Sequence, residues 1–250
     1  MITLNSHDAV HKAWLYRVLI AIVDNANLHN LYFKGGTCAA MAGVLDRFSV
    51  DLDFDYVGNQ AELGKIRQEL EEIFKNLGLE IKDASVKVPQ FFLKYPTKNN
   101  SDRNTLKIDI SFPPPRANVY EPTKLVDIGR VVICQNTPTM FANKLVAVID
   151  RFELSNSIAG RDIYDIHHFF INGYDYNKDV ITERTKLSLI DFFKKLSHFI
   201  DAHVTETILS QDLNPLIPYE RFNKLRKVLK RETLMFLKDE MIRLNSNYHN

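Results

Sequence analysis

Residues 34–55, with the sequence KGGTCAAMAGVLDRFSVDLDFD, constrain the fold more than any other part of the chain. A short apolar run leads into the pair Gly35-Gly36, and Thr37 and a short apolar stretch follow. Glycine has no Cβ, so the backbone can pass close to a phosphate at this point. Thr37 is placed to cap the helix that follows, whose free N–H groups and dipole would form an anion site. The segment therefore predicts a strand, a phosphate-binding turn and a short helix.

Alternating aspartates follow this unit in the run DLDFDY. Successive side chains of a strand point to opposite faces, so Asp51, Asp53 and Asp55 would share one face. Carboxylates arranged in this way repel each other unless a cation lies between them, and hard oxygen ligands suit Mg²⁺, with Mn²⁺ as an alternative. A half-buried strand with a solvated acidic face is the commoner meaning of such alternation. Because the glycine pair lies one short helix upstream, we favour a metal-dependent phosphoryl-transfer site.

A third acid is predicted from the run LKIDISF at residues 106–112. Its apolar residues point one way, so Lys107, Asp109 and Ser111 point the other way. If this strand lies beside residues 51–55 in the sheet, Asp109 joins the acidic face as a metal ligand or a base. A lone aspartate on a half-exposed strand is otherwise an ordinary surface residue.

These residues carry a family resemblance. Gly35-Gly36-Thr37 followed by Asp51-Leu52-Asp53 resembles the signature of the polymerase-β-like nucleotidyltransferase superfamily. Residues 47–54, with Lys34 before the glycines, are similar to the AbiEii/AbiGii-type nucleotidyltransferase toxins of bacterial abortive-infection and toxin–antitoxin systems. A second block resembles the C-terminal motifs of that family, and it comprises Lys144, Asp150-Arg151 and the run RDIYDI at residues 161–166.

The resemblance implies an α/β (α+β) fold, in which a polymerase-β-like core with a mixed sheet flanked by helices precedes a helical C-terminal domain. It implies transfer of a nucleoside monophosphate from an NTP to an acceptor, with Mg²⁺ as the metal. The expected metal ligands and catalytic acids are Asp51, Asp53 and Asp109. The expected contacts to nucleotide phosphates are Lys34, Gly35, Gly36, Thr37, Lys144 and Arg151, with Asp162 or Asp165 completing the site.

Lys144 and Arg151 share one face of a predicted helix, and Asp162 and Asp165 share a face of the next. Arg161 is also placed to pair with Asp165 across one helical turn. An ion-pair network that ties the two helices together is the structural alternative to a nucleotide contact. The residues themselves do not decide between the two interpretations.

The acceptor that the resemblance implies is the 3′ end of tRNA or another cellular RNA, with growth arrest as the outcome and a cognate antitoxin as partner. One alternative is NMP or phosphoryl transfer to a protein or small-molecule hydroxyl. A different class of function is a binding module for NTP or RNA without turnover. The net charge of +1 provides no general attraction to RNA, but residues 221–231 hold six lysines and arginines that suit phosphate contacts as well as an ordinary solvated helix.

A chain of 250 residues accommodates two domains, which we place at residues 1–136 and 137–250. Short strand-like runs lie at residues 79–81, 91–95, 105–112 and 131–134. Helical patterns lie at residues 9–23, 59–77, 140–152, 161–171 and 182–200, with two more helices beyond Pro218. The sequence has no apolar run long enough to span a bilayer, and its two cysteines form no disulfide framework, so we expect a cytoplasmic protein.

Overall fold

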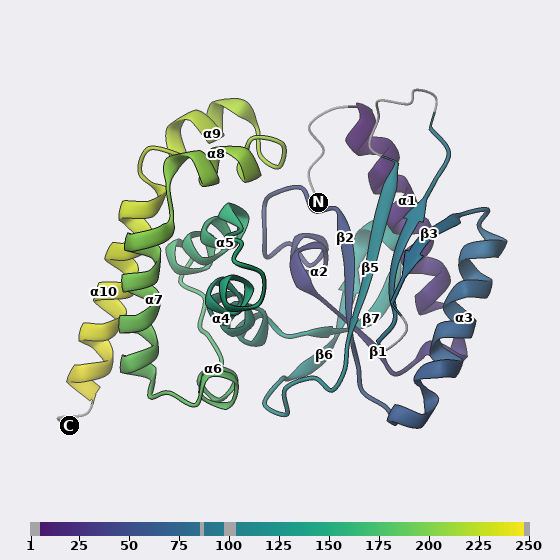
Figure 1. Ribbon diagram of the computed structural model, residues 1–250, viewed down its shortest axis with the longest axis horizontal. Coiled ribbons are helices and arrows are strands. Elements are labelled where there is room, and N and C mark those ends of the chain that lie inside the picture. The colour runs from purple at the N-terminus through teal and green to yellow at the C-terminus, as the bar shows by residue number, and fades with distance from the viewer. Residues whose placement is uncertain (1–5, 86–87, 98–103, 248–250) are drawn as a thin grey trace. The chain divides into compact units, whose positions relative to one another are not determined.

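A computed structural model describes residues 6–85, 88–97 and 104–247 (Figure 1). The chain divides into two compact units, which are described separately below. The first unit contains Met1–Pro114 and Tyr120–Gln135, and the second contains Pro115–Val119 and Asn136–Asn250. Pro115–Val119 belongs with the helices, where the Glu183 carboxylate accepts the backbone N–H groups of Arg116 and Ala117 at 2.9 and 2.7 Å. The units differ in this segment from the division predicted at residues 136 and 137, which remains a prediction.

The first unit is built on a mixed sheet, which has seven strands within the described residues, in the order β3-β4-β5-β2-β1-β7-β6. β1 is antiparallel to β2 and parallel to β7, while β2 is parallel to β5. The strands are β1 (Leu31–Lys34), β2 (Asp51–Tyr56), β3 (Glu80–Ala84), β4 (Gln90–Lys94), β5 (Thr105–Ser111), β6 (Tyr120–Leu125) and β7 (Arg130–Gln135). The sequence analysis did not predict β6, because Pro122 weakens the strand pattern and is tolerated only at a sheet edge.

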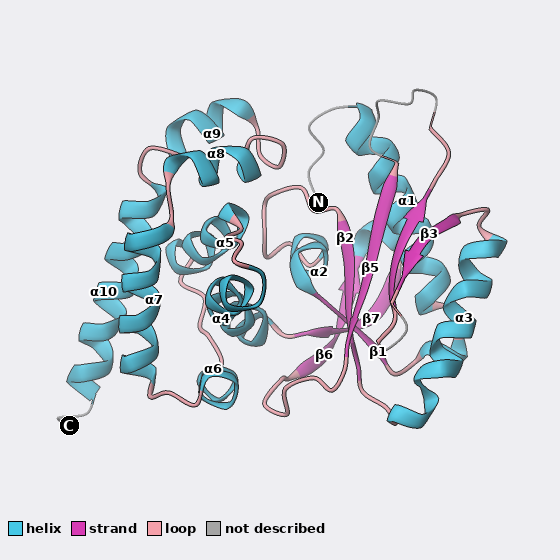
Figure 2. Cartoon of the chain, in the orientation of Figure 1, coloured by secondary structure: helices cyan, strands magenta, loops and turns pink. Residues whose placement is uncertain are grey.

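Helices α1 (Ser6–Val23) and α3 (Leu63–Asn76) cover one face of this sheet, as Figure 2 shows. The apolar residues of β2 are buried together with the apolar stripes of these helices. Helix α2 (Gly35–Met41) follows β1 directly. Short 3₁₀ helices are η1 (Ala26–Leu28), η2 (Gln60–Glu62) and η3 (Val126–Ile128). The predicted helix over residues 59–77 is therefore a 3₁₀ turn followed by α3, and Gly78 in the left-handed region (φ +73°) ends it.

The second unit is all helical within the described residues. Its helices are α4 (Thr137–Ser155), α5 (Gly160–Ile171), α6 (Lys178–Thr185), α7 (Leu189–His203), α8 (Glu206–Leu213), α9 (Tyr219–Leu225) and α10 (Leu229–Asn247). The predicted single helix over residues 182–200 is wrong, because α6 ends before Lys186 in the left-handed region and Ser188 caps a new helix by accepting the Asp191 N–H. The sequence analysis also missed α8.

Aromatic side chains fill the core of this helical unit. The rings of Phe141 on α4 and Phe169 on α5 stack with centroids 4.7 Å apart. Gly160 allows the start of α5 to approach α8, since a Cβ at this position would lie 2.9 Å from the Ile208 carbonyl oxygen. None of the helices in the described residues is both long enough and apolar enough to cross a bilayer.

Candidate active site

The predicted site residues fall into two groups, and each group lies within one of the two units. The first group surrounds strands β2 and β5 of the sheet unit. Their parallel register pairs Asp53 with Asp109 and Asp51 with Lys107, so these side chains share one face. The prediction that the strand carrying Asp109 lies beside the acidic strand is confirmed.

The three carboxylates of this face have different surroundings. Asp109 accepts hydrogen bonds from Lys107 Nζ at 2.5 Å and from Gln90 Nε2 at 3.1 Å, whereas Asp51 is partly exposed. Within residues 6–85, 88–97 and 104–247, no group of three or more His, Cys, Asp or Glu side chains is gathered closely enough to enclose a metal ion. The donor chemistry and the shared face fit a divalent cation. Both hydrogen bonds to Asp109 end on Oδ2, so Oδ1 is the oxygen available to a cation.

Gly35 is required where α2 begins beside the acidic face. Its φ of +79° lies in the left-handed region, and a Cβ would stand 2.2 Å from an Asp53 carboxylate oxygen. At Gly36, a Cβ would lie 2.8 Å from an Nη atom of the buried Arg47. The two glycines therefore leave room for protein side chains. Their proposed contact with phosphate remains a prediction.

Thr37 does not cap α2, so that part of the sequence analysis is wrong. The helix begins at Gly35, its N-cap residue is Lys34, and no side chain caps it. Thr37 is fully buried inside the helix, and its hydroxyl donates a hydrogen bond to the Asp51 carbonyl oxygen. This bond ties α2 to the first residue of β2, next to the acidic face. The Thr37 hydroxyl therefore has a structural role, and the sequence motif alone does not show it.

Lys34 and Asp55 pair with each other. Lys34 Nζ lies 2.6 Å from Asp55 Oδ1 and 2.7 Å from Ser111 Oγ. Asp55 shares the face of Asp51 and Asp53 along β2, but its side chain is fully buried. These contacts set Asp55 apart from the other two aspartates of the strand.

The second group lies on α4 and α5 of the helical unit. Lys144 Nζ is 2.8 Å from Asp162 Oδ1 and 3.0 Å from Asp165 Oδ2, and Arg151 Nε is 3.4 Å from Asp162 Oδ2. Both aspartates are buried. Asp165 therefore pairs with Lys144, and the pair between Arg161 and Asp165 remains a prediction. The four side chains tie the two helices together, as the structural alternative anticipated.

Two atoms of this cluster form an ion pair without a hydrogen bond. Arg151 Nε and Asp162 Oδ2 are buried and lie 3.4 Å apart, and neither forms a hydrogen bond with a described residue. Each atom is therefore the ionic partner of the other, and the pair belongs to the network that ties α4 to α5.

Charge neighbours also determine the ionisation of this cluster. Burial alone would raise the pKa of the Asp162 carboxyl, but the Lys144 ammonium and the Arg151 guanidinium hold that pKa below its usual value. The Asp162 carboxylate is therefore ionised near neutral pH.

We expect Asp162→Asn to make the free energy of unfolding depend less on pH in the acid range. The pKa of Asp162 is lower in the folded protein than in the unfolded chain, so its carboxylate stabilises the fold above the unfolded pKa of about 3.9. This stabilisation disappears as the pH falls through the lower pKa of the folded state. Urea unfolding is measured at a series of pH values from about 7 to about 3. The difference in the free energy of unfolding between wild type and variant should become smaller as the pH falls. If the free energies of unfolding of wild type and variant change in parallel with pH, the lowered pKa of Asp162 is wrong.

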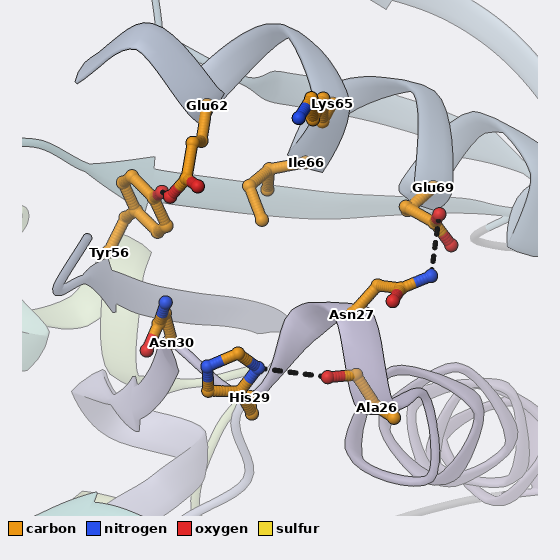
Figure 3. Close-up of a pocket in the computed structure, with 9 residues that line it drawn as sticks. All are labelled: Ala26, Asn27, His29, Asn30, Tyr56, Glu62, Lys65, Ile66 and Glu69. Atoms are coloured by element: carbon orange, nitrogen blue, oxygen red, sulfur yellow. Dashed lines mark hydrogen bonds between the residues drawn. The ribbon is translucent and has the colours of Figure 1, made fainter. Parts of the chain in front are cut away.

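A separate pocket of about 440 Å³ lies between η1 and α3 of the sheet unit (Figure 3). Its lining residues are Ala26, Asn27, His29, Asn30, Tyr56, Glu62, Lys65, Ile66 and Glu69. The Glu69 carboxylate accepts hydrogen bonds from the amides of Asn25 and Asn27 at 3.0 and 2.8 Å. Tyr56 alternates with Asp55 on β2, so it points to the opposite face of the sheet. The pocket contains none of the predicted site residues, and we assign it no catalytic role.

A glycine turn beside an acidic strand pair, within a mixed sheet followed by a helical unit, defines the class of nucleotidyltransferases. The comparisons with known proteins agree with this class. The sequence model of the family described as "Nucleotidyl transferase AbiEii toxin, Type IV TA system" matches residues 17–236. The chain belongs to this AbiEii family of nucleotidyltransferase toxins.

Solved structures show the same fold. A candidate nucleotidyltransferase from H. pylori is 21% identical with a TM-score of 0.59, and the match covers 97% of this chain and 98% of that chain. JHP933 from Helicobacter pylori is 21% identical with a TM-score of 0.54, and the match covers 98% of this chain and 100% of that one. A search of curated protein sequences found no significant match.

Sequence reasoning missed several polar partners of the site. Lys107 and Ser111 alternate with Asp109 on one strand, so their placement on the acidic face followed from the pattern, but their bonds did not. Tyr120 and Gln135 donate hydrogen bonds to Asp55, and they and Gln90 come from strands that meet the site only through sheet pairing. No local signal in the sequence identifies them.

Proposed function

We propose that this protein transfers a nucleoside monophosphate from an NTP to the 3′ end of tRNA, with pyrophosphate leaving, and that this transfer arrests growth. The observation that carries the proposal is the register pair Asp53 and Asp109, next to the turn at Gly35. Membership of the AbiEii family supports both an NTP substrate and a cognate antitoxin. The tRNA acceptor rests on the resemblance of the sequence motifs to this toxin family.

Asp51, Asp53 and Asp109 would hold the divalent cation, Mg²⁺ or Mn²⁺. When bound, the cation offsets the charge of the triphosphate and lowers the pKa of the attacking hydroxyl. Asp109 would take up the proton of that hydroxyl. These roles use two neighbouring strands, which hold the carboxylates more rigidly than a loop would.

The remaining predicted residues would orient and stabilise the phosphates. Backbone N–H groups at Gly36 and Thr37 would hold the terminal phosphates, and Lys144 and Arg151 would offset the negative charge that develops during transfer. The Arg151 side chain is partly exposed, which leaves its guanidinium accessible to a phosphate. Two buried cysteines without a disulfide, Cys38 and Cys134, are in keeping with a reducing cytoplasm.

Incubation with each α-labelled NTP tests this function. The purified protein, Mg²⁺ and total cellular RNA are mixed, and the label is followed into RNA and into protein. We expect one NTP or a subset of them to label RNA of tRNA size, with the label at the 3′ end and none when a chelator removes the metal. The cognate antitoxin should suppress the labelling. Label in protein alone, or in no macromolecule, would contradict the proposed acceptor.

A further inference from the structure

Asp55 is the centre of a polar network that joins five neighbouring strands. Its Oδ1 accepts a hydrogen bond from Lys34 Nζ at 2.6 Å, and its Oδ2 accepts from Tyr120 Oη at 2.8 Å and from Gln135 Nε2 at 2.6 Å. Lys34 Nζ also donates to Ser111 Oγ at 2.7 Å. The five residues lie on β5, β2, β1, β7 and β6, which are consecutive in the sheet. The network therefore runs across the sheet on the face that carries the acids.

These contacts exclude Asp55 from the set of open metal ligands. The Asp55 side chain is 0% exposed, and both of its oxygens already accept hydrogen bonds from protein donors. A metal ion would have to displace the Lys34 ammonium, the tyrosine hydroxyl or the amide. Asp51 and Asp53, in contrast, are partly exposed on the same strand. The third aspartate of the motif thus has a different task from the first two.

Lys34 connects this network to the acidic face. It is the register partner of Asp53 across β1 and β2, and its side chain is 21% exposed. An ammonium group carries three N–H donors, and the described partners, Asp55 and Ser111, take two of them. The third N–H remains for a ligand. A phosphate oxygen that approaches Asp53 is the kind of acceptor it suits.

We propose that Asp55 is a positioning residue that holds the Lys34 ammonium beside Asp53, so that Lys34 binds a phosphate oxygen of the nucleoside triphosphate. The inference rests on the proposed function, since it concerns the same site. It assigns Asp55 a role through Lys34 and not through the metal. Ser111 provides the second anchor of the ammonium, while Tyr120 and Gln135 hold the far side of the carboxylate.

Nucleotide binding tests this inference without turnover. The affinities of the four NTPs and of the four unphosphorylated nucleosides are measured by calorimetry with Mg²⁺, for wild type, Lys34→Met and Asp55→Asn. A lost hydrogen bond to a charged group predicts a loss of triphosphate affinity of roughly ten- to a hundredfold in each variant, with nucleoside affinity unchanged. The double variant should lose little more than either single variant, because the two residues act as one unit.

A gentler pair of variants covers the case in which Asp55→Asn unfolds. Ser111→Ala removes an anchor of Lys34 and should weaken triphosphate binding several-fold. Tyr56→Phe is the control, because it removes a hydroxyl that bonds Glu62 at 3.2 Å on the opposite face of the sheet, so it should leave triphosphate affinity unchanged. Equal effects of these two variants on triphosphate affinity would overturn the inference.

Three further outcomes separate a failure of this inference from a failure of the proposed function. If wild type binds triphosphates and folded Lys34→Met or Asp55→Asn binds them equally well, the positioning role is wrong while the proposed function stands. An altered Mg²⁺ requirement in Asp55→Asn, with triphosphate affinity kept at saturating Mg²⁺, would instead make Asp55 a metal ligand and overturn the inference. If wild type binds no triphosphate, the proposed function fails and the inference fails with it.

Discussion

Asp53→Asn should lower the rate of NMP transfer by more than about a hundredfold, because replacing even an outer partner of a metal ligand costs ten- to a hundredfold. The substitution keeps the size and shape of the side chain but removes the charge that a divalent cation requires. Asp53 is the residue that is paired with both Asp109 and Lys34 across the sheet, and its carboxylate lies against Gly35. Transfer of label from an α-labelled NTP measures the effect, and thermal unfolding shows whether the fold is retained.

The matched control for this variant is Asp24→Asn in the same unit. Asp24 is an exposed aspartate whose carboxylate pairs with the Arg130 guanidinium at 2.8 and 2.9 Å. Loss of such an exposed pair changes stability by at most about 1 kcal/mol, and transfer should continue at the rate of wild type. Full activity of folded Asp53→Asn would rule out the metal role of this carboxylate.

Lys144→Met should destabilise the helical unit by about 3–5 kcal/mol near neutral pH, which is the usual cost of leaving a buried charge without its partner. Lys144 Nζ contacts both Asp162 and Asp165, whose side chains are only 2% and 0% exposed. The methionine keeps most of the apolar stem, so lost packing contributes little. Two buried carboxylates would then lie close together without the ammonium group that contacts both of them. Urea unfolding followed by circular dichroism measures the loss.

Lys195→Met is the control for Lys144→Met. Lys195 Nζ pairs with Glu153 at the same distance of 2.8 Å, but both side chains are about half exposed. Its loss should change the free energy of unfolding by at most about 1 kcal/mol. Adding Asp165→Asn to Lys144→Met should recover part of the lost stability, because one buried charge is removed. If Lys144→Met and Lys195→Met unfold alike, the buried cluster does not stabilise the unit.

Some parts of the site were predictable because they depend on a few adjacent residues. The alternation of Asp51, Asp53 and Asp55 with apolar residues places these aspartates on one face of any strand they form. The spacing of seven residues between Lys144 and Arg151 likewise places both side chains on one face of α4. The break at Lys186 was not predictable from periodicity, because apolar residues continue on both sides of it and the cap at Ser188 decides the outcome.

The sequence alone determined the family motif, through its resemblance to known proteins. It also determined the acidic face and the succession of a mixed sheet and a helical region, because these follow from the periodicity of neighbouring side chains. Only the tertiary structure decided what each acid contacts. Strand pairing places Asp109 next to Asp53 and surrounds Asp55 with donors from three other strands, so one aspartate of DLDFD is buried while two remain accessible. Burial and partner choice depend on residues distant in sequence, and no local pattern records those contacts.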